Sequence, residues 1–264
     1  MPIGQAGAAT PETEDVNMDL NNKVAVVTGA SGGIGSVTAR RLAEAGARVI
    51  VGYNTRRADA EKVAAGLHGT GHCAARIPML ETPVIQDVAG MVERHYGRCD
   101  VLVNSAGFTR MIPHHELNAL TDDLIDAIMA ANVRGPFATI RAFAPLMKKS
   151  GNAVIVNISS IAATSGTGSN IAYGASKAAL DTMATSLARV LGPEIRVMTV
   201  SPAAVDTAFV PGRTTAMVER VAATTPLKRV VQADEVAQAV MAAVTHLTAS
   251  TGMVIPVDGG KLVG

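Results

Sequence analysis

The stretch "KVAVVTGASGGIG", residues 23–35, decides the fold of this chain. Its first half is a short β-branched run, which is typical of a buried strand. The glycines that follow permit a tight turn, and Gly29, Gly33 and Gly35 let the backbone approach a pyrophosphate closely. A helix that begins at this loop supplies N–H donors and the positive end of its dipole. A strand, a glycine loop and a helix in this order predict a dinucleotide-binding site.

Similar short runs continue along the chain and alternate with longer helical stretches. They lie at 48–53, 100–105, 153–159, 195–200 and 252–257, with a weaker one at 72–77. Continuous hydrophobicity means that both faces of a strand are covered, as in a parallel sheet, and the stretches between are long enough for crossover helices. We therefore expect an α/β fold: a single doubly wound (Rossmann) domain whose parallel sheet of six or seven strands has helices on both faces.

The composition excludes several classes of protein. Of the 264 residues, 48% are hydrophobic and 17% are charged, with a net charge of +1. These values favour a globular protein and give no reason to expect nucleic acid or a membrane as a partner. No apolar run approaches the ~20 residues that a membrane helix needs. Cys73 and Cys99 do not suggest a disulfide framework, which favours a reducing, cytoplasmic compartment.

Residues 1–20 lack the basic patch and apolar core of a secretory signal, so we expect a flexible polar arm there, followed by the domain over 21–264. Glycines separate His68 from His72, and His114 and His115 are adjacent. Neither pair has the geometry of two ligands on one helix face, so no metal site is expected.

The end of the second run bears on which dinucleotide binds. An acidic residue there would hold the ribose hydroxyls of NAD, but Tyr53 and Asn54 occupy the place. Arg56 and Arg57 follow and can meet a 2′-phosphate; the alternative is a pair of solvated arginines. Arginine in the first turn of a helix opposes the dipole, which favours the functional interpretation. We expect NADP(H) rather than NAD(H).

The segment "IAYGASKAAL", residues 171–180, places a tyrosine and a lysine four residues apart, and hence on one helix face. A free tyrosine has a pKa of ~10 and is a poor base at neutral pH. An ammonium about 4 Å away, at an effective dielectric of about 20, favours the phenolate by about 4 kcal/mol, or up to about three pKa units. Tyr173 is then able to exchange a proton with an alcohol oxygen. The alternative is a buried tyrosine beside a surface lysine.

Two further side chains favour the chemical interpretation. Ser160 follows the run at 153–159, at the sheet edge where such folds bind ligands, and its hydroxyl can bond a carbonyl oxygen. Asn132 lies in a helical stretch four residues before Pro136, which has no N–H to return to the Asn132 carbonyl. We expect a kink and a free backbone acceptor at Asn132 that holds a water in a proton relay from Lys177. The alternative is a Gly-Pro kink required only by packing.

The motifs "TGASGGIG", "NSAG" (104–107), "YGASK" (173–177) and "SPAAVDT" (201–207), with Asn132 and Ser160, resemble the classical short-chain dehydrogenases/reductases, in particular 3-oxoacyl-ACP reductase-like members. The resemblance covers about residues 20–260. It implies an NAD(P)(H)-dependent oxidoreductase that interconverts a small-molecule ketone, such as a 3-oxoacyl group, and a secondary alcohol by hydride transfer. It also implies a homo-oligomer, a tetramer or a dimer.

By resemblance, Tyr173 is the catalytic acid/base, and Lys177 lowers its pKa and binds the nicotinamide ribose. Ser160 holds the substrate oxygen, and Asn132 anchors the relay water. Asn104 is expected beside the adenosine ribose, and Val205 and Thr207 beside the nicotinamide carboxamide. The full cofactor site is expected to consist of Gly29, Ser31, Gly33, Ile34, Gly35, Tyr53, Asn54, Arg56, Asn104, Ala106, Gly107, Tyr173, Lys177, Val205 and Thr207.

Several positions depart from the family pattern. Ser105 replaces a second asparagine, and Ala203 replaces a glycine after the run at 195–200. Pro78 stands where an aspartate often bonds the adenine amino group, which leaves only an apolar contact from Met79. Gly32 occupies a position where NADP-using members often carry arginine or lysine, and this weakens the expectation of NADP(H).

The resemblance assigns residues 208–229 to a loop that covers the substrate. An apolar pocket lined by Phe108, Met111, Phe209, Val210 and Met217 is one interpretation of the nearby side chains, and ordinary packing is the other. We expect Arg213 to be solvated rather than to attract an acidic substrate.

Two other classes of protein share parts of this pattern. A non-catalytic dinucleotide-binding or sensing protein would need only the glycine loop, so the complete set of Ser160, Tyr173, Lys177 and Asn132 argues against it. A sugar-nucleotide epimerase also uses a tyrosine and a lysine four apart, but usually has a longer C-terminal substrate domain. The sequence favours the oxidoreductase.

Overall fold

The computed structural model describes residues 17–263 of the chain. Most of the arm expected over residues 1–20 lies outside that range. The described end of it is packed against the domain, because Met18 and Leu20 are buried and the Met18 N–H donates to the Thr245 carbonyl at 2.9 Å.

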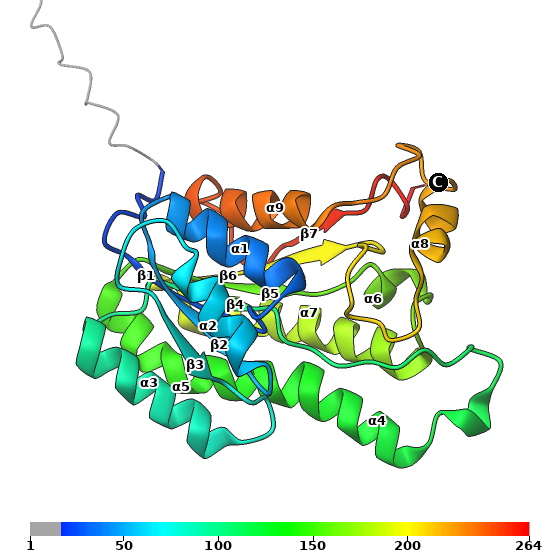
Figure 1. Cartoon of the computed structure of the whole chain (residues 1–264), viewed down its shortest axis with the longest axis horizontal. Coiled ribbons are helices and arrows are strands. Elements are labelled where there is room, and N and C mark those ends of the chain that lie inside the picture. Colours follow the sequence, from blue (N-terminus) through cyan, green and yellow to red (C-terminus); the bar gives the residue numbers. More distant parts are fainter. Residues whose placement is uncertain (1–16, 264) are drawn as a thin grey trace, which may run out of the picture.

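Seven parallel strands form one sheet in the order β3-β2-β1-β4-β5-β6-β7 (Figure 1). The order reverses between β1 and β4, which leaves a crevice at the carboxyl ends of these two strands. The expected strands are all present, including the weak one at 72–77. Their bounds are Val24–Thr28 (β1), Arg48–Tyr53 (β2), Cys73–Arg76 (β3), Val101–Asn104 (β4), Ala153–Ile158 (β5), Ile195–Pro202 (β6) and Val254–Val257 (β7).

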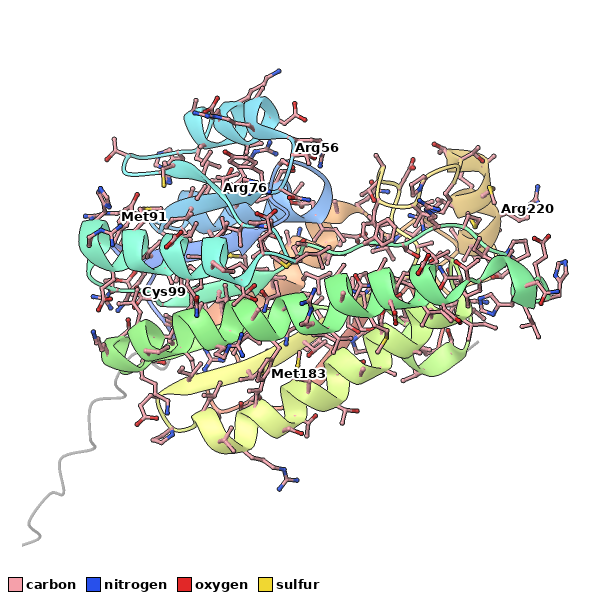
Figure 2. The ribbon with its side chains drawn as sticks, turned by 90° about the horizontal axis from the view of Figure 1, so that it is seen from below. Arg56, Arg76, Met91, Cys99, Met183 and Arg220 are labelled. Atoms are coloured by element: carbon pink, nitrogen blue, oxygen red, sulfur yellow. The ribbon has the colours of Figure 1, made fainter. Side chains whose placement is uncertain are left out.

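Helices cover both faces of the sheet. Helices α1, α2 and α9 lie on one face, and α3, α5 and α7 lie on the other (Figures 1 and 2). Helices α3 and α5 run side by side. The helices are Gly33–Glu44 (α1), Arg57–Ala65 (α2), Thr82–Tyr96 (α3), Asp122–Met129 (α4), Gly135–Ser150 (α5), Ala162–Ser165 (α6), Ile171–Leu191 (α7), Thr215–Ala222 (α8) and Ala233–Thr245 (α9), with a 3-10 turn at Leu117–Ala119 (η1) and a π-helical turn at Ala130–Arg134 (η2).

Alternate residues of the central strands enter two separate cores. In β1, Ala25 and Val27 pack toward α1 and α9, whereas Val24 and Val26 pack toward α3 and α5. Since side chains alternate across a strand, a sheet covered on both faces needs apolar residues at every position. This two-sided burial explains why the strand runs are continuously hydrophobic.

The α-helix is interrupted before Pro136, in the stretch where the sequence predicts a kink. A π-helical turn joins α4 to α5, and Pro136 lies in the first turn of α5, where a helix does not need its N–H. Packing also requires this geometry, because a Cβ on Gly135 would lie 2.6 Å from the Met79 Cβ. The contact with Met79 supports the packing explanation, and the free backbone acceptor at Asn132 stays a prediction.

One buried carboxylate ties the amino ends of β1 and β4 together. Asp100 is fully buried, accepts the Val24 N–H at 2.9 Å, and accepts two hydrogen bonds from Arg98 at 2.8 and 2.6 Å. The Lys23 ammonium lies 3.9 Å away. Because the carboxylate is desolvated, these donors are needed to stabilise its negative charge in the folded protein.

We expect Asp100→Asn to lower the free energy of unfolding by about 3 kcal/mol, because an amide replaces an acceptor with a donor facing other donors. Chemical denaturation of both proteins measures this, with Asp87→Asn on the exposed side of α3 as the control. A loss no larger than that of the control would contradict the assigned role of Asp100.

Candidate active site

A cavity of about 1160 Å³ opens at the carboxyl ends of the strands. Its walls come from the segments that follow all seven strands, together with parts of α7 and α8. Ligand pockets commonly span ~300–1,000 Å³, so this one has room for two molecules. It lies where an open parallel sheet is expected to bind its ligands.

The loop after β1 has a shape that only glycine permits. Gly29 has a φ of +65°, and a Cβ there would lie 2.8 Å from the Ala106 Cα. A Cβ on Gly35 would lie 2.6 Å from the Gly29 carbonyl oxygen. The loop therefore packs tightly against the segment after β4 and against its own helix.

The start of α1 is open toward the cavity. Gly33 has a φ of +56°, and the nearest atoms to a Cβ there, on Thr207, would be 3.9 Å away. The N-cap residue Gly32 provides no side-chain acceptor, and the first turn of α1 contains no acidic residue. Unsatisfied N–H groups at such a helix terminus fit the phosphates of a dinucleotide. Ser31 and Ile34 also line the cavity here.

Only some of the residues predicted near the end of β2 line the cavity. Asn54 and Arg56 line the cavity, and a Cβ on Gly32 would lie 3.2 Å from the Arg56 guanidinium. Arg57 instead pairs with Glu61 at 2.8 Å. Tyr53 does not line the cavity, because alternation along β2 turns this side chain toward the core beside α1 and α2. Its contact with the cofactor stays a prediction.

The asparagine of "NSAG" is held by the neighbouring strand, and its contact with the adenosine ribose stays a prediction. Asn104 is buried off the cavity wall, and its amide nitrogen donates to Asn157 Oδ1 at 2.9 Å on the neighbouring strand. Asn104 Oδ1 and Asn157 Nδ2 have no protein partner in the described chain. The neighbours Ala106 and Gly107 do line the cavity. Thr28 Oγ1 holds this segment by accepting the N–H groups of Ser105 and Ala106, both at 3.1 Å.

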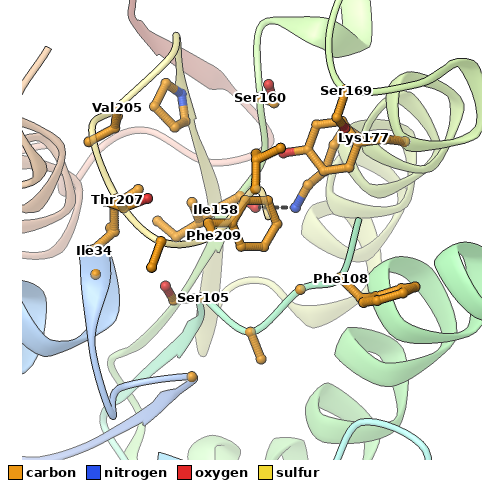
Figure 3. A pocket seen from close by; sticks show the side chains of 18 of the residues that line it. Ile34, Ser105, Phe108, Ile158, Ser160, Ser169, Lys177, Val205, Thr207 and Phe209 are labelled. Atoms are coloured by element: carbon orange, nitrogen blue, oxygen red, sulfur yellow. Dashed lines mark hydrogen bonds between the residues drawn. The ribbon is translucent and has the colours of Figure 1, made fainter. Parts of the chain in front are cut away.

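Helix α7 carries the tyrosine and the lysine. Asn170 is its N-cap: it is extended, and its Oδ1 accepts the Tyr173 N–H at 2.7 Å. Tyr173 and Lys177 follow one turn apart, 8% and 4% exposed, and both line the cavity. Ser160, just after β5, lines the same cavity (Figure 3), and its hydroxyl is close enough to Tyr173 to lower the pKa of the phenol. The structure therefore brings these three predicted side chains together.

The lysine does not meet the phenol in the expected way. Lys177 Nζ donates to the Ile158 carbonyl at 2.8 Å and lies 5.7 Å from the centre of the Tyr173 ring (Figure 3). Burial raises the pKa of Tyr173 to about 12, although the Ser160 hydroxyl and the Arg213 charge oppose this. Burial lowers the pKa of Lys177 to about 8, against the influence of Asp181. The expectation that the lysine makes the phenol acidic is wrong for the protein alone, because desolvation dominates.

Asn132 joins three parts of the site without lining the cavity. Its side chain is fully buried: Oδ1 accepts the Phe108 N–H at 2.8 Å, and Nδ2 donates to the Phe108 carbonyl and to Ser176 Oγ, both at 3.0 Å. This clamp fixes the loop after β4 to the residue that precedes Lys177. The water relay through the Asn132 backbone carbonyl stays a prediction.

A second polar cluster ties the same loop to the start of α7, and it was not predicted. Asn170 Nδ2 donates to Thr109 Oγ1 at 3.2 Å and to the Arg110 carbonyl at 2.8 Å, and the hydroxyls of Thr109 and Ser169 lie 2.5 Å apart. An asparagine directly before a predicted helix is an N-cap signal that would have identified Asn170. Its contacts with the loop depend on tertiary structure.

The chain between β6 and α9 forms the outer wall. Val205 and Thr207 line the cavity, and Val205 pairs with Val231 as an isolated bridge. The Phe209 ring is tilted at 52° to the Tyr173 ring, with their centroids 6.1 Å apart. The candidate pocket side chains all reach the wall: Phe108, Met111, Phe209, Val210 and Met217.

Among residues 17–263, no three histidine, cysteine, aspartate or glutamate side chains gather closely enough to hold a metal ion. In the same part of the chain, no helix combines the length and the apolar character needed to span a bilayer.

Known proteins resemble this chain along nearly its whole length. The family model described as enoyl-(acyl carrier protein) reductase matches residues 29–261. The 3-oxoacyl-[acyl-carrier-protein] reductase FabG of Thermotoga maritima is 34% identical, over 93% of this chain and 100% of the relative.

Two solved structures share the fold. A candidate short-chain dehydrogenase/reductase from Burkholderia xenovorans has a TM-score of 0.85 and 34% identity, over 92% of this chain and 98% of its own. A gluconate 5-dehydrogenase from Burkholderia cenocepacia, in complex with NADP and tartrate, has a TM-score of 0.83 and 26% identity. The match covers 93% of this chain and 97% of the dehydrogenase chain.

The buried ammonium predicts a pH dependence of stability. Because burial lowers the pKa of Lys177 from 10.5 to about 8, the unfolded chain binds more protons than the folded protein between these values. Stability from this group therefore rises with pH across that window. Between pH 7.5 and 9.5, we expect the free energy of unfolding of the wild type to gain roughly 2 kcal/mol relative to Lys177→Met.

Chemical denaturation at several pH values measures this difference, with the exposed Lys148→Met as the control. A constant difference between wild type and Lys177→Met across the window would show that the ammonium is not desolvated.

Proposed function

Because this chain belongs to the short-chain dehydrogenase/reductase family, we propose that it is an NAD(P)(H)-dependent oxidoreductase that interconverts a ketone and a secondary alcohol. One observation carries the proposal: the Tyr173 phenol, the Ser160 hydroxyl and the glycine loop share one cavity. A non-catalytic dinucleotide sensor is not favoured, because it has no use for this buried set.

The residues at the glycine loop fit the dinucleotide. The open N-terminus of α1 would hold the pyrophosphate, and Val205 and Thr207 lie on the wall that would face the nicotinamide. The bound cofactor supplies or accepts the hydride. The chain then has to bind the substrate oxygen and move one proton.

We assign the proton transfer to Tyr173. Its phenol is protonated at neutral pH, since burial raises its pKa to about 12, so it can donate to the carbonyl oxygen as that oxygen gains charge. The Ser160 hydroxyl orients the same oxygen. Lys177 lies beside the tyrosine ring as a cation, which stabilises the phenolate left behind. Asn132 is a positioning residue in this scheme, and its backbone carbonyl is the proposed anchor of the relay water.

We propose NADP(H) as the preferred cofactor. The end of β2 carries no acid at the cavity, and Arg56 reaches the wall at Gly32, where it can meet a 2′-phosphate. The space that a basic side chain at position 32 would fill is thus occupied by a guanidinium from position 56. The NADP complex of the related gluconate 5-dehydrogenase is consistent with this proposal.

For the substrate, we propose a 3-oxoacyl compound. The family model and the FabG relative both carry acyl-group reductase names, and apolar side chains from residues 208–229 form the outer wall. We assign this segment to covering the substrate. A homo-oligomer, a tetramer or a dimer, and a cytoplasmic location stay predictions of the sequence.

Tyr173→Phe should lower kcat by about 10³-fold in NADPH-dependent ketone reduction, because it removes the proton donor. Cofactor affinity, measured by NADPH fluorescence, should change by less than about threefold. Tyr96→Phe, whose hydroxyl bonds the Gly71 carbonyl away from the cavity, is the matched control. A variant that keeps more than a tenth of wild-type kcat would refute the assignment of Tyr173.

Arg56→Gln should weaken NADPH binding by about tenfold or more and leave NADH binding nearly unchanged, since only NADPH carries the 2′-phosphate. The neighbouring Arg57→Gln is the control, because Arg57 pairs with Glu61 rather than lining the cavity. Calorimetric titration of both cofactors decides the question. Tighter binding of NADH than of NADPH by the wild type would overturn the cofactor proposal.

A further inference from the structure

Charges on the cavity wall are strongly unbalanced. Its ionisable lysine, arginine and acidic side chains comprise five cations and one acid, Glu81, which Arg76 neutralises through a paired hydrogen bond. Arg56 belongs to the adenosine end and Lys177 to the catalytic group. The three other cations lie on or next to the outer wall and have no role in the scheme above: Arg213, Arg220 and Lys261.

Arg213 is the cation of this group that lies deepest. It is half-buried, lines the cavity, and its Nη2 donates to the Val205 carbonyl. Its charge lowers the pKa of Tyr173, which places the guanidinium within electrostatic reach of the proposed proton donor. The sequence-based expectation of a solvated arginine is therefore wrong.

The guanidinium has no carboxylate partner within residues 17–263, since no oxygen of Asp or Glu in that range lies within 4 Å of it. Asp206 is the nearby acid, but it is exposed and accepts the Thr215 hydroxyl at 3.0 Å. Burial lowers the pKa of Arg213, and the charges of Tyr173 and Asp206 oppose this only in part. A half-buried cation with one carbonyl acceptor retains donors for an anion that enters the cavity.

Two further cations line the outer part of the cavity, and of these Arg220 is exposed and Lys261 is partly buried. Arg220 projects from α8 toward solvent (Figure 2). Lys261 follows β7, and its Nζ donates to Thr224 Oγ1 at 3.2 Å. Positive charges at a rim raise the local concentration of an anionic ligand and speed its association. Arg220 and Lys261 can thus attract an anion toward the cavity, and Arg213 can bind it inside, near Tyr173.

We propose that the substrate ketone carries a carboxylate, and that Arg213 binds this carboxylate and so determines substrate specificity. The inference rests on the proposed function and narrows its substrate class from 3-oxoacyl compounds in general to free oxo acids. The ketone carbon gains a hydride from the reduced cofactor, its oxygen gains the Tyr173 proton, and the product is a hydroxy acid with the same carboxylate. A neutral thioester of the same acyl group would leave the guanidinium without an anionic partner.

The test compares substrates that share a ketone but differ in charge. Acetoacetate and levulinate are paired with their ethyl esters and with acetoacetyl-N-acetylcysteamine, and NADPH oxidation is followed for each. We expect the wild type to show a lower KM for the acids. Arg213→Gln should raise the KM for the acids by about tenfold or more and change the KM for the neutral compounds by less than about threefold. Arg213→Lys should restore part of the affinity for the acids.

Matched variants separate the inner charge from the outer ones. Arg220→Gln should reduce kcat/KM for the acids mainly at low ionic strength, as expected for a steering charge. Arg189→Gln, exposed near the end of α7, should change nothing. NADPH affinity should be the same in all variants. A loss of NADPH affinity in Arg213→Gln would assign the guanidinium to the cofactor and overturn the proposal.

A binding measurement keeps this inference separate from the proposed function. Calorimetric titration of acetoacetate and levulinate into the protein saturated with NADP⁺ should show binding to the wild type and loss of it in Arg213→Gln. Turnover of the free acids with equal KM in the wild type and Arg213→Gln would refute the carboxylate inference alone. Absence of turnover with every ketone would refute the proposed function, whereas acid binding that depends on Arg213 would still support this site.

Discussion

The active site depends on one constraint: a phenol and an ammonium are both removed from water in the same wall of the cavity. Tyr173 and Lys177 are buried together on α7, and burial moves their pKa values in opposite directions, to about 12 and about 8. The phenol is thereby kept as a proton donor, while the ammonium is brought close to the range in which it exchanges protons with water. Both effects come from the apolar packing of the sheet and its helices, and neither requires a direct hydrogen bond between the two side chains.

The surroundings of the pair hold it in place through backbone contacts. Asn170 caps α7 and bonds the loop after β4, and Asn132 clamps that loop to the residue before Lys177. Lys177 in turn bonds the carbonyl at the end of β5. Glycines after β1 let the neighbouring loops approach within contact distance. The cavity is thus built from short polar ties between the carboxyl ends of adjacent strands, which the parallel sheet brings to one edge.

Much of this architecture follows from the sequence. The continuous β-branched runs mark the strands because a sheet covered on both faces is apolar at every position, and the four-residue spacing places Tyr173 and Lys177 on one helix face. The positions of Tyr53 and Asn104 were not predictable in the same way. Tyr53 depends on the pleat of β2, and Asn104 on the register that sets it beside Asn157. The direction of the Tyr173 pKa shift depends on how completely the folded chain buries the phenol, and the burial of Arg213 depends on how the chain after β6 folds over the cavity.

The central claim is that Tyr173 stays protonated through burial and becomes a better acid when a positive nicotinamide lies beside it. Tyrosine labelled with ¹³C at Cζ gives three resonances in this chain, and Tyr173→Phe identifies the relevant one. Its titration should give a pKa of about 12 in the protein alone and a value at least about one unit lower with NADP⁺ bound. A pKa below 10 in the protein alone, or no change with NADP⁺, would contradict this account.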